Sequence, residues 1–256
     1  MPWNFPLWQV FRFACPNLMG GNVGILKHAP CVTGCGLLIE QIFKDAGFPE
    51  YVFQTVVLEN ETAKLAIEHP KVRGVTLTGS VKAGQAVGAL AAGALKKCVL
   101  ELGGNNAIIV TPDADIKMTV IGAVFGAVGT CGQRCTSTRR LIIHESIYDK
   151  VKDAVVDAYG QLRIGNPLDE NNHVGPLIDT DAVAMYNNAL TQVVEEGGKI
   201  IVEGGVLSGE GYESGCYVKP AIAEAGNDFK IVQHETFAPV LYLLKYSGSV
   251  EDAIAT

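Results

Sequence analysis

The sequence predicts an α/β protein whose first half is doubly wound, with a parallel sheet covered by helices on both faces. Short β-branched runs alternate with helical stretches along the 256 residues, and short links join them. Such repetition is typical of parallel sheets, because parallel strands need a crossover connection that is usually a helix. The 29 glycines and the aromatic content of only 7% also favour a glycine-punctuated α/β protein over an all-β sandwich.

The first hundred residues alternate strands and helices. Residues 23–27 are expected to form a strand, and Pro30 opens the turn that follows. A helix is expected over residues 33–46, because an apolar stripe recurs at helical spacing and Gly47 stands where helices commonly end. The remaining predicted elements are a strand at 52–57, a helix at 61–69 stopped by Pro70, a strand at 74–78, a helix from Gly79-Ser80 to near Gly93, and a strand at 98–102.

Residues 102–106, with two consecutive glycines, are a candidate domain crossing. The elements expected beyond it are a strand at 107–110, an Asp-capped helix at 115–128, a strand at 140–144, a Ser-capped helix at 146–162, a helix at 179–196, a glycine-rich hairpin or loop at 204–215, and strands at 217–220 and 240–245. The chain stops at Thr256 inside a helix expected to begin near Val250, from which we expect the sequence to be a fragment.

Composition excludes several classes of protein. With 48% apolar and 18% charged residues the chain can bury a sizeable core, so it is not disordered. A net charge of −7 argues against nucleic-acid binding, and no apolar stretch approaches the ~18 residues of a membrane span. No signal peptide is legible, and seven cysteines, an odd number in a long chain, favour a reducing compartment. We therefore expect a cytoplasmic protein without nucleic-acid or membrane partners.

Two side chains stand out as candidates for catalysis, although each also has an ordinary structural explanation. Cys135 lies in a glycine-broken turn beside Arg134, and a neighbouring cation favours the nucleophilic thiolate, but a buried structural thiol would fit as well. Glu101 ends an apolar strand just before two glycines and is a candidate general base, or else a carboxylate at the sheet edge that points to water.

Other candidates concern ligand binding. Gly79 and Ser80 join a strand to a helix, where amides and the Ser hydroxyl can hold a phosphate, or simply cap the helix. The amide of Asn4 can serve an oxyanion or a turn, and Lys27 can reach nucleotide hydroxyls or lie at the surface. Glu235 and Phe237 are a candidate sugar-binding carboxylate and ring-stacking aromatic, or part of a loop that enters a strand.

Metal binding is the alternative use of the cysteines. Cys31 and Cys35, like Cys131 and Cys135, have a four-residue spacing that places a pair on one helical face. Structural zinc sites more often use tighter turns or histidine partners, and only His28 is near either pair. We therefore predict no metal site.

Taken together, the motifs resemble the aldehyde dehydrogenase superfamily over essentially the whole chain. The segments that carry the resemblance, in family order and approximate spacing, are Pro2-Trp3-Asn4-Phe5-Pro6, Lys27, Leu77-Thr78-Gly79-Ser80, Glu101-Leu102-Gly103-Gly104, Gly132-Gln133-Arg134-Cys135 and Glu235-Thr236-Phe237-Ala238-Pro239. The resemblance implies a Rossmann-like doubly wound cofactor domain over residues 1–102, incomplete, followed by an α/β catalytic domain over residues 103–256 that lacks its C-terminal end.

The resemblance also implies NAD(P)-dependent oxidation of an aldehyde to a carboxylic acid. Cys135 would attack the aldehyde and form a thiohemiacetal, Asn4 and the Cys135 amide would bind the oxyanion, and Glu101 would activate water against the resulting thioester. Residues implied to bind the cofactor are Lys27 at the adenosine ribose, Gly79 and Ser80 at a phosphate, Glu235 at the nicotinamide ribose, Phe237 near the nicotinamide, and Trp3 at the boundary between cofactor and substrate.

The implied substrate is a semialdehyde with a remote carboxylate. The first hundred residues resemble succinate-semialdehyde dehydrogenases, whereas the segment from Asn105 to Tyr242 is more similar to α-aminoadipic semialdehyde dehydrogenases, which we take as the first choice. Arg134 would clamp the carboxylate, because a guanidinium binds it bidentately. The alternative for Arg134 is an internal ion pair.

Three features depart from the family pattern. Family members carry a long segment before the Pro-Trp-Asn motif and another beyond the position of Thr256, which supply oligomer contacts, and the full-length parent is expected to be a homodimer or homotetramer. Pro30 stands three residues after Lys27, where many NAD-selective members have a glutamate that repels a 2′-phosphate. NAD is the expected cofactor, and the absence of this glutamate leaves NADP open. Besides the enzyme, a catalytically silent fragment is the alternative.

Overall fold

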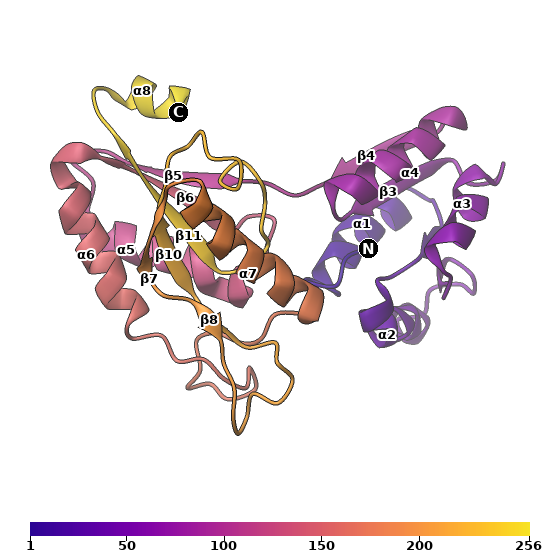
Figure 1. Ribbon diagram of the computed structural model, residues 1–256. Coiled ribbons are helices and arrows are strands. Elements are labelled where there is room, and N and C mark those ends of the chain that lie inside the picture. Colours follow the sequence, from indigo (N-terminus) through magenta and orange to yellow (C-terminus); the bar gives the residue numbers. More distant parts are fainter. The chain divides into compact units, whose positions relative to one another are not determined.

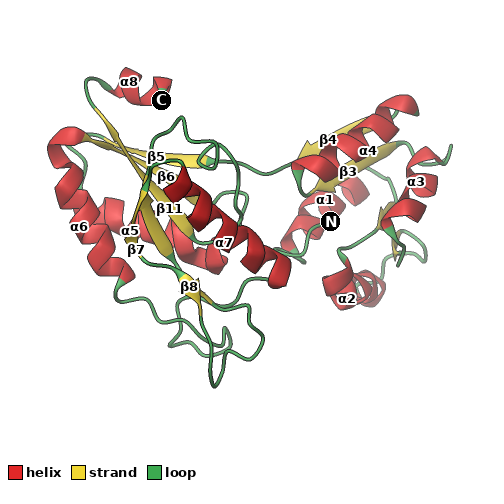
Figure 2. Ribbon diagram, in the orientation of Figure 1, coloured by secondary structure: helices red, strands yellow, loops and turns green.

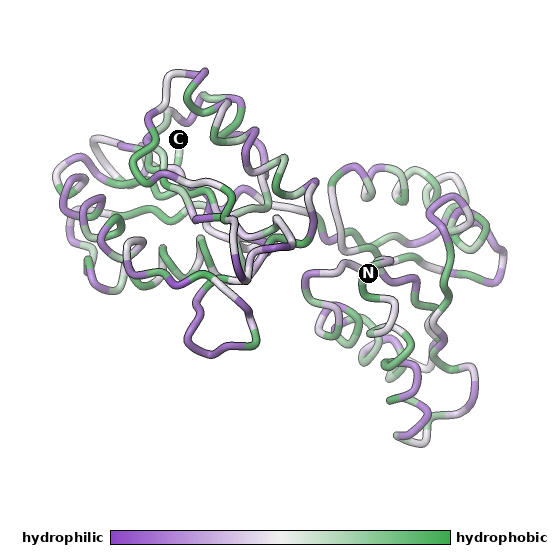
Figure 3. Tube along the Cα trace, turned by 60° about the horizontal axis from the view of Figure 1, so that its bottom comes forward, coloured by the Kyte–Doolittle hydropathy of each residue, from purple (hydrophilic) through white to green (hydrophobic).

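The computed structural model describes all residues 1–256, which form two compact units, Met1–Gly103 and Gly104–Thr256. Both units contain parallel strands joined through helices, which confirms the predicted α/β class (Figure 1, Figure 2). Hydrophobic and hydrophilic stretches alternate along the trace of both units (Figure 3). The roles of the units, cofactor binding and catalysis, stay proposals.

The first unit alternates helices and strands close to the predicted positions. Its elements are α1 (Trp8–Met19), β1 (Gly24–Leu26), the short η1 (Pro30–Val32), α2 (Thr33–Asp45), β2 (Phe53–Thr55), α3 (Asn60–Glu68), β3 (Gly74–Thr78), α4 (Val81–Gly93) and β4 (Lys97–Glu101). Helix α1 was not predicted from the sequence; it contains Pro16, and proline usually disfavours a helix interior.

The strands of the first unit form two separate parallel pairs, β1–β2 and β3–β4, rather than one continuous sheet. Met1 pairs with the segment that follows β1. Its amino group donates a hydrogen bond to the Lys27 carbonyl at 2.7 Å, and the Ala29 amide donates to the Met1 carbonyl at 3.0 Å. Residues 2–6 do not extend this pairing as a strand, because Pro2 and Pro6 have no N–H to donate.

The core of the first unit is an aromatic cluster centred on Phe43. Its ring lies 5.6, 5.2 and 4.8 Å from those of Phe11, Phe48 and Phe53. Val10 of α1 and Ile39 of α2 are fully buried beside it. This packing fixes α1 against β1, and so fixes the Pro-Trp-Asn segment that leads into α1.

The second unit is built on a five-stranded sheet in the order β5-β6-β11-β10-β7, parallel except for β7. Its elements are β5 (Asn106–Val110), α5 (Ile116–Val128), η2 (Gly129–Gly132), β6 (Thr138–His144), η3 (Glu145–Ile147), α6 (Tyr148–Tyr159), α7 (Thr180–Glu195), β7 (Lys199–Val202), β8 (Gly205–Val206), β9 (Val218–Lys219), β10 (Ala221–Glu224), β11 (Val240–Tyr246) and α8 (Val250–Ala255). The strands β7 and β10 were not predicted as such.

Helices cover both faces of this sheet. In Figure 1, α7 crosses in front of the sheet and α5 lies behind it, packed against α6. The strands β6 and β11 are buried almost throughout, as expected for parallel strands covered on both faces. The loop that precedes β6 and the loop that precedes β11 therefore both emerge at the amino-terminal edge of the same two central strands.

The structure also tests the predicted helix caps. The carboxylate of Asp115 accepts a hydrogen bond from the Met118 amide at 2.9 Å, so the predicted aspartate cap is confirmed. Asp179, for which no cap was predicted, accepts in the same way from the Ala182 amide at 2.8 Å. The predicted Ser146 cap is wrong, since α6 begins only at Tyr148. Ser146 lies in the turn η3, where its amide donates to the His144 ring at 3.2 Å.

Candidate active site

The candidate nucleophile Cys135 follows an unusual turn at the end of α5. Thr130, Cys131 and Gly132 have φ values of 56°, 53° and 66°, a left-handed path that non-glycine residues rarely take. A Cβ on Gly132 would lie 2.6 Å from the carbonyl of Ala238, so the turn is pressed against the loop that precedes β11. Position 132 therefore requires glycine for two reasons: its φ is positive, and the Ala238 carbonyl leaves no room for a Cβ.

The backbone around Cys135 is held by a side chain from β5. Asn106 Nδ2 donates hydrogen bonds to the carbonyls of Cys135 and Ser137, at 2.7 and 3.0 Å. The Cys135 side chain is partly exposed, whereas Cys131 is buried and burial raises its pKa to about 12. Of these two neighbouring thiols, only Cys135 is therefore accessible for chemistry.

Arg134 lies on an apolar surface without an acidic partner. Its Nε donates to Thr130 Oγ1 at 2.8 Å, and its guanidinium carbon lies 5.0 Å from the centre of the Phe125 ring. The internal ion pair considered as the alternative is not formed in the structure. Arg134 borders a cavity of about 480 Å³ lined mainly by apolar side chains of α5. A negatively charged group that entered this cavity would lie close to the positive charge of the Arg134 guanidinium.

Glu235 and Phe237 lie in the loop that leads into β11. The Gly104 amide donates to Glu235 Oε1 at 3.2 Å, and Arg139 lies 4.0 Å from the same oxygen. Burial raises the pKa of Glu235, while the Gly104 hydrogen bond and the Arg139 charge act in the opposite direction. Phe237 has a φ of 54°, and its ring centre lies 5.8 Å from the Arg139 guanidinium carbon.

The first unit holds the remaining predicted residues. Glu101 ends β4, its side chain is 53% exposed, and Arg12 of α1 pairs with it at 3.5 Å. Within the first unit the Glu101 carboxylate is therefore exposed and ion-paired. Gly79 is joined to Glu101 through a 3.0 Å hydrogen bond from its amide to the Glu101 carbonyl.

Ser80 caps α4, because its hydroxyl accepts a hydrogen bond from the Ala83 amide at 3.2 Å. The side chain is exposed, and other amides in the first turn of a helix have no partner within the helix. Lys27, Trp3 and Asn4 are half-buried near the start of the unit.

The structure thus brings the predicted residues together in two groups. Cys135, Arg134, Glu235 and Phe237 belong to adjoining loops of the second unit, and Gly79, Ser80 and Glu101 to adjoining strand ends of the first. Convergence of Cys135 with Asn4 and Glu101 spans the two units and stays a prediction. Sequence reasoning missed Arg12, Asn106 and Arg139, since a lone arginine or asparagine gives no pattern that separates an interior role from a surface one.

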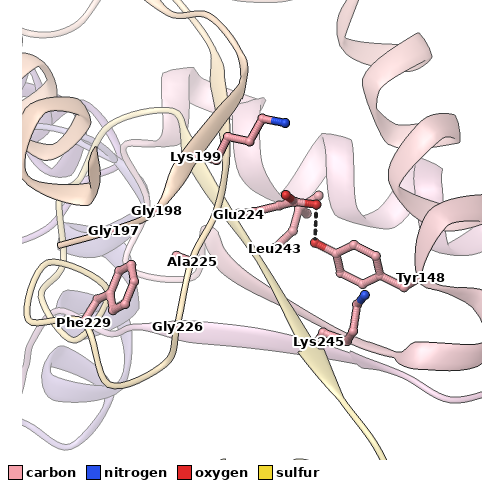
Figure 4. A pocket seen from close by; sticks show the side chains of 10 residues that line it. All are labelled: Tyr148, Gly197, Gly198, Lys199, Glu224, Ala225, Gly226, Phe229, Leu243 and Lys245. Carbon is pink, nitrogen blue, oxygen red and sulfur yellow. Dashed lines mark hydrogen bonds between the residues drawn. The ribbon is translucent and has the colours of Figure 1, made fainter. Parts of the chain in front are cut away.

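Another cavity, of about 360 Å³, lies at the carboxyl ends of β10 and β11 (Figure 4). The Tyr148 hydroxyl donates to Glu224 Oε1 at 3.0 Å in its wall. Because β6 and β11 are parallel, this cavity lies at the opposite edge of the sheet from the loop of Cys135. It holds none of the predicted site residues.

The structure contains no group of three or more histidine, cysteine, aspartate or glutamate side chains placed to hold a metal ion. All seven cysteines are unpaired. None of the helices has the length and apolar character needed to cross a membrane.

Comparison with known proteins identifies the family. The chain belongs to the aldehyde dehydrogenase family, whose model matches residues 1–256. It is 40% identical over 94% of its length to succinate semialdehyde dehydrogenase [NAD(P)+] Sad of Escherichia coli (strain K12), covering 51% of that protein. It is 39% identical over 99% of its length to succinate-semialdehyde dehydrogenase [NADP(+)] 1 of Mycobacterium tuberculosis (strain ATCC 25618 / H37Rv), covering 55% of it.

A solved structure described as "Structural insights into cofactor and substrate selection by Gox0499" matches with a TM-score of 0.94 at 39% identity, over 99% of this chain and 55% of that one. The chain thus spans about half the length of the relatives it matches. These relatives are named for succinate semialdehyde, the alternative substrate considered from the sequence, and their names do not support the first choice, aminoadipic semialdehyde.

Proposed function

We propose that the protein oxidises succinic semialdehyde to succinate with NAD(P)+, and that Cys135 is the nucleophile. The observation that carries this proposal is the accessible thiol of Cys135, which follows a left-handed turn and whose backbone carbonyl is held by Asn106, whereas the neighbouring Cys131 is buried. The names of the similar relatives support the substrate and the cofactor.

The donor set fits a dinucleotide. Ser80 and the first amides of α4 offer hydrogen-bond donors to a phosphate, at the positive end of a 13-residue helix. Glu235, in the second unit, offers carboxylate oxygens to sugar hydroxyls, and the Gly104 amide fixes its orientation. When bound, the nicotinamide supplies the hydride acceptor for the oxidation.

The chain's own residues supply the other steps. The Cys135 thiolate adds to the aldehyde carbon and forms a thiohemiacetal, and the developing oxyanion accepts hydrogen bonds from the Asn4 amide and the Cys135 N–H. After oxidation to the thioester, Glu101 takes a proton from water, whose oxygen then adds to the acyl carbon and releases the acid and the thiolate.

Arg134 would recognise the remote carboxylate of the substrate. Its guanidinium has no carboxylate partner in the protein and borders a cavity lined mainly by apolar side chains. A bidentate ion pair with the substrate would complete its hydrogen bonding. This role distinguishes a carboxylated semialdehyde from a neutral aldehyde of similar length.

The test is steady-state and rapid-mixing kinetics on the protein expressed from its complete coding sequence. We expect NAD(P)H formation with succinic semialdehyde at a kcat/KM roughly ten-fold or more above that for butanal, since a hydrogen bond to a charged group contributes about 1.5–3 kcal/mol. Aminoadipic semialdehyde should be the poorer of the two carboxylated substrates. Cofactor binding without turnover of any aldehyde would favour the catalytically silent alternative instead.

A further inference from the structure

Arg139, the second residue of β6, is the largest side chain that is almost completely buried, with 2% of its surface exposed. Burial lowers the pKa of its guanidinium to about 10, which still leaves it charged at neutral pH. A charge withdrawn from water this far needs a reason, because charged side chains are seldom fully buried unless they are paired.

The contacts of Arg139 join the two loops of the candidate site. One terminal nitrogen donates to the Ala238 carbonyl at 2.9 Å, and the other donates to the Arg134 carbonyl at 3.3 Å and lies 4.0 Å from Glu235 Oε1. Ala238 follows Phe237, and Arg134 precedes Cys135. A single planar fork thus spans the loop of the nucleophile and the loop of the predicted cofactor carboxylate.

These contacts are not of the kind that would make Arg139 contribute much to the stability of the folded protein. Its one ion partner is 4.0 Å away, and its Nε makes no hydrogen bond within the protein. A buried ion pair of such geometry stabilises a fold poorly, and apolar residues of similar volume often replace one without loss of stability. What apolar residues cannot replace is the pair of directed bonds to the two carbonyls.

We propose that Arg139 is a positioning residue that holds the Cys135 loop and the loop of Glu235–Phe237 in their relative places. The proposal rests on the proposed function, which gives these loops the nucleophile and the cofactor contacts. It adds that one buried guanidinium, bound to the backbone carbonyls of both loops, sets the relative positions of these two loops within the second unit.

The experiment compares Arg139→Met with Arg140→Met in the protein expressed from its complete coding sequence. Arg140 is the matched control, since its guanidinium donates to Asn227 Oδ1 and to the Asn105 carbonyl and to neither loop. In Arg139→Met we expect amide hydrogen exchange to rise about ten-fold or more in segments 130–137 and 234–239 together, with the strands of the sheet unchanged. Arg140→Met should leave both segments as in the unsubstituted protein.

Kinetics provide a second measurement. Arg139→Met should lower kcat about 100-fold, because a displacement of about 1 Å at a reacting group costs that much. Its cofactor binding should weaken at a higher pH than in the unsubstituted protein, because the cation that lowers the pKa of Glu235 is gone. Arg139→Lys, with a single point charge, should restore the pH dependence more fully than the exchange protection.

The outcomes separate the two proposals. If the unsubstituted protein turns over no aldehyde, the proposed function fails, while hydrogen exchange still decides the role of Arg139. Unchanged protection of both segments in Arg139→Met would overturn the positioning role. If that variant does not fold, Arg139→Lys decides, and full protection of both loops with unchanged kcat in it would equally overturn the role, because lysine cannot reproduce the fork.

Discussion

The Gly104 amide donates a 3.2 Å hydrogen bond to the Glu235 carboxylate, although 131 positions separate the two residues in the chain. Gly104 comes immediately after the Glu101-Leu102-Gly103 segment, and its lack of a side chain matters, since a Cβ there would lie 3.1 Å from the Cys135 carbonyl. One glycine therefore touches the loop of the nucleophile and orients the predicted cofactor carboxylate.

The first prediction concerns pH. Glu235 accepts hydrogen bonds from sugar hydroxyls best when ionised, and burial raises its pKa, so its charge is lost at a higher pH than that of an exposed glutamate. We expect NAD(P)+ affinity to weaken as the pH falls toward the ordinary glutamate pKa of about 4.3, with the loss beginning at a higher pH than for an exposed glutamate. Fluorescence titration of the cofactor at falling pH checks it.

Glu235→Gln is the control for this prediction. The amide cannot ionise, so affinity should be lower at neutral pH and should no longer change as the pH falls. If Glu235→Gln kept the pH dependence of the unsubstituted protein, another group would be responsible.

The second prediction distinguishes the two cysteines of the turn. Cys135→Ala should reduce aldehyde oxidation by about 1,000-fold or more while cofactor affinity is retained, because covalent catalysis is lost but binding groups stay. Cys131→Ala should retain most activity, since burial raises the pKa of that thiol to about 12 and keeps it protonated. Iodoacetamide labelling followed by peptide mass analysis should modify Cys135 much faster than Cys131. Normal turnover by Cys135→Ala would end the proposed mechanism.

The third prediction concerns substrate recognition by Arg134. Arg134→Met should raise KM for succinic semialdehyde about ten- to 100-fold, the equivalent of one charge-assisted hydrogen bond of about 1.5–3 kcal/mol, and should leave the kinetics with butanal nearly unchanged. Arg134→Lys should recover only part of the loss, because an ammonium cannot bind a carboxylate as a planar fork. An equal loss with both aldehydes would show that Arg134 only supports the turn.

The fourth prediction concerns the tight contact beneath the turn. Gly132→Ala should destabilise the protein by about 1–3 kcal/mol, since its φ is +66° and its Cβ would lie 2.6 Å from the Ala238 carbonyl. Gly122→Ala, in α5 with no atom within 4 Å of its Cβ, should be neutral or stabilising by up to about 1 kcal/mol. Thermal denaturation measures the Tm of both variants. Equal Tm values for Gly132→Ala and Gly122→Ala would contradict the predicted steric conflict at position 132.

Much of the local structure could be predicted from sequence. The strand β3 and the aspartate cap of α5 follow from short-range signals, namely a β-branched run and an Asp residue before an apolar helix. The helix α1 was missed because Pro16 argues against a helix there, and its apolar contacts with β1 and α2 outweigh that local preference.

The sequence by itself determined the α/β class and the family, because motif order and strand–helix alternation are written along one dimension. Only the tertiary structure decided that Arg139 is buried between two loops, that Arg134 stacks on Phe125 without forming an ion pair, and that Glu101 meets Arg12 in its own unit. These contacts join residues up to 99 positions apart. Burial and partnership of a charge depend on what folds against it, which no short stretch of sequence encodes.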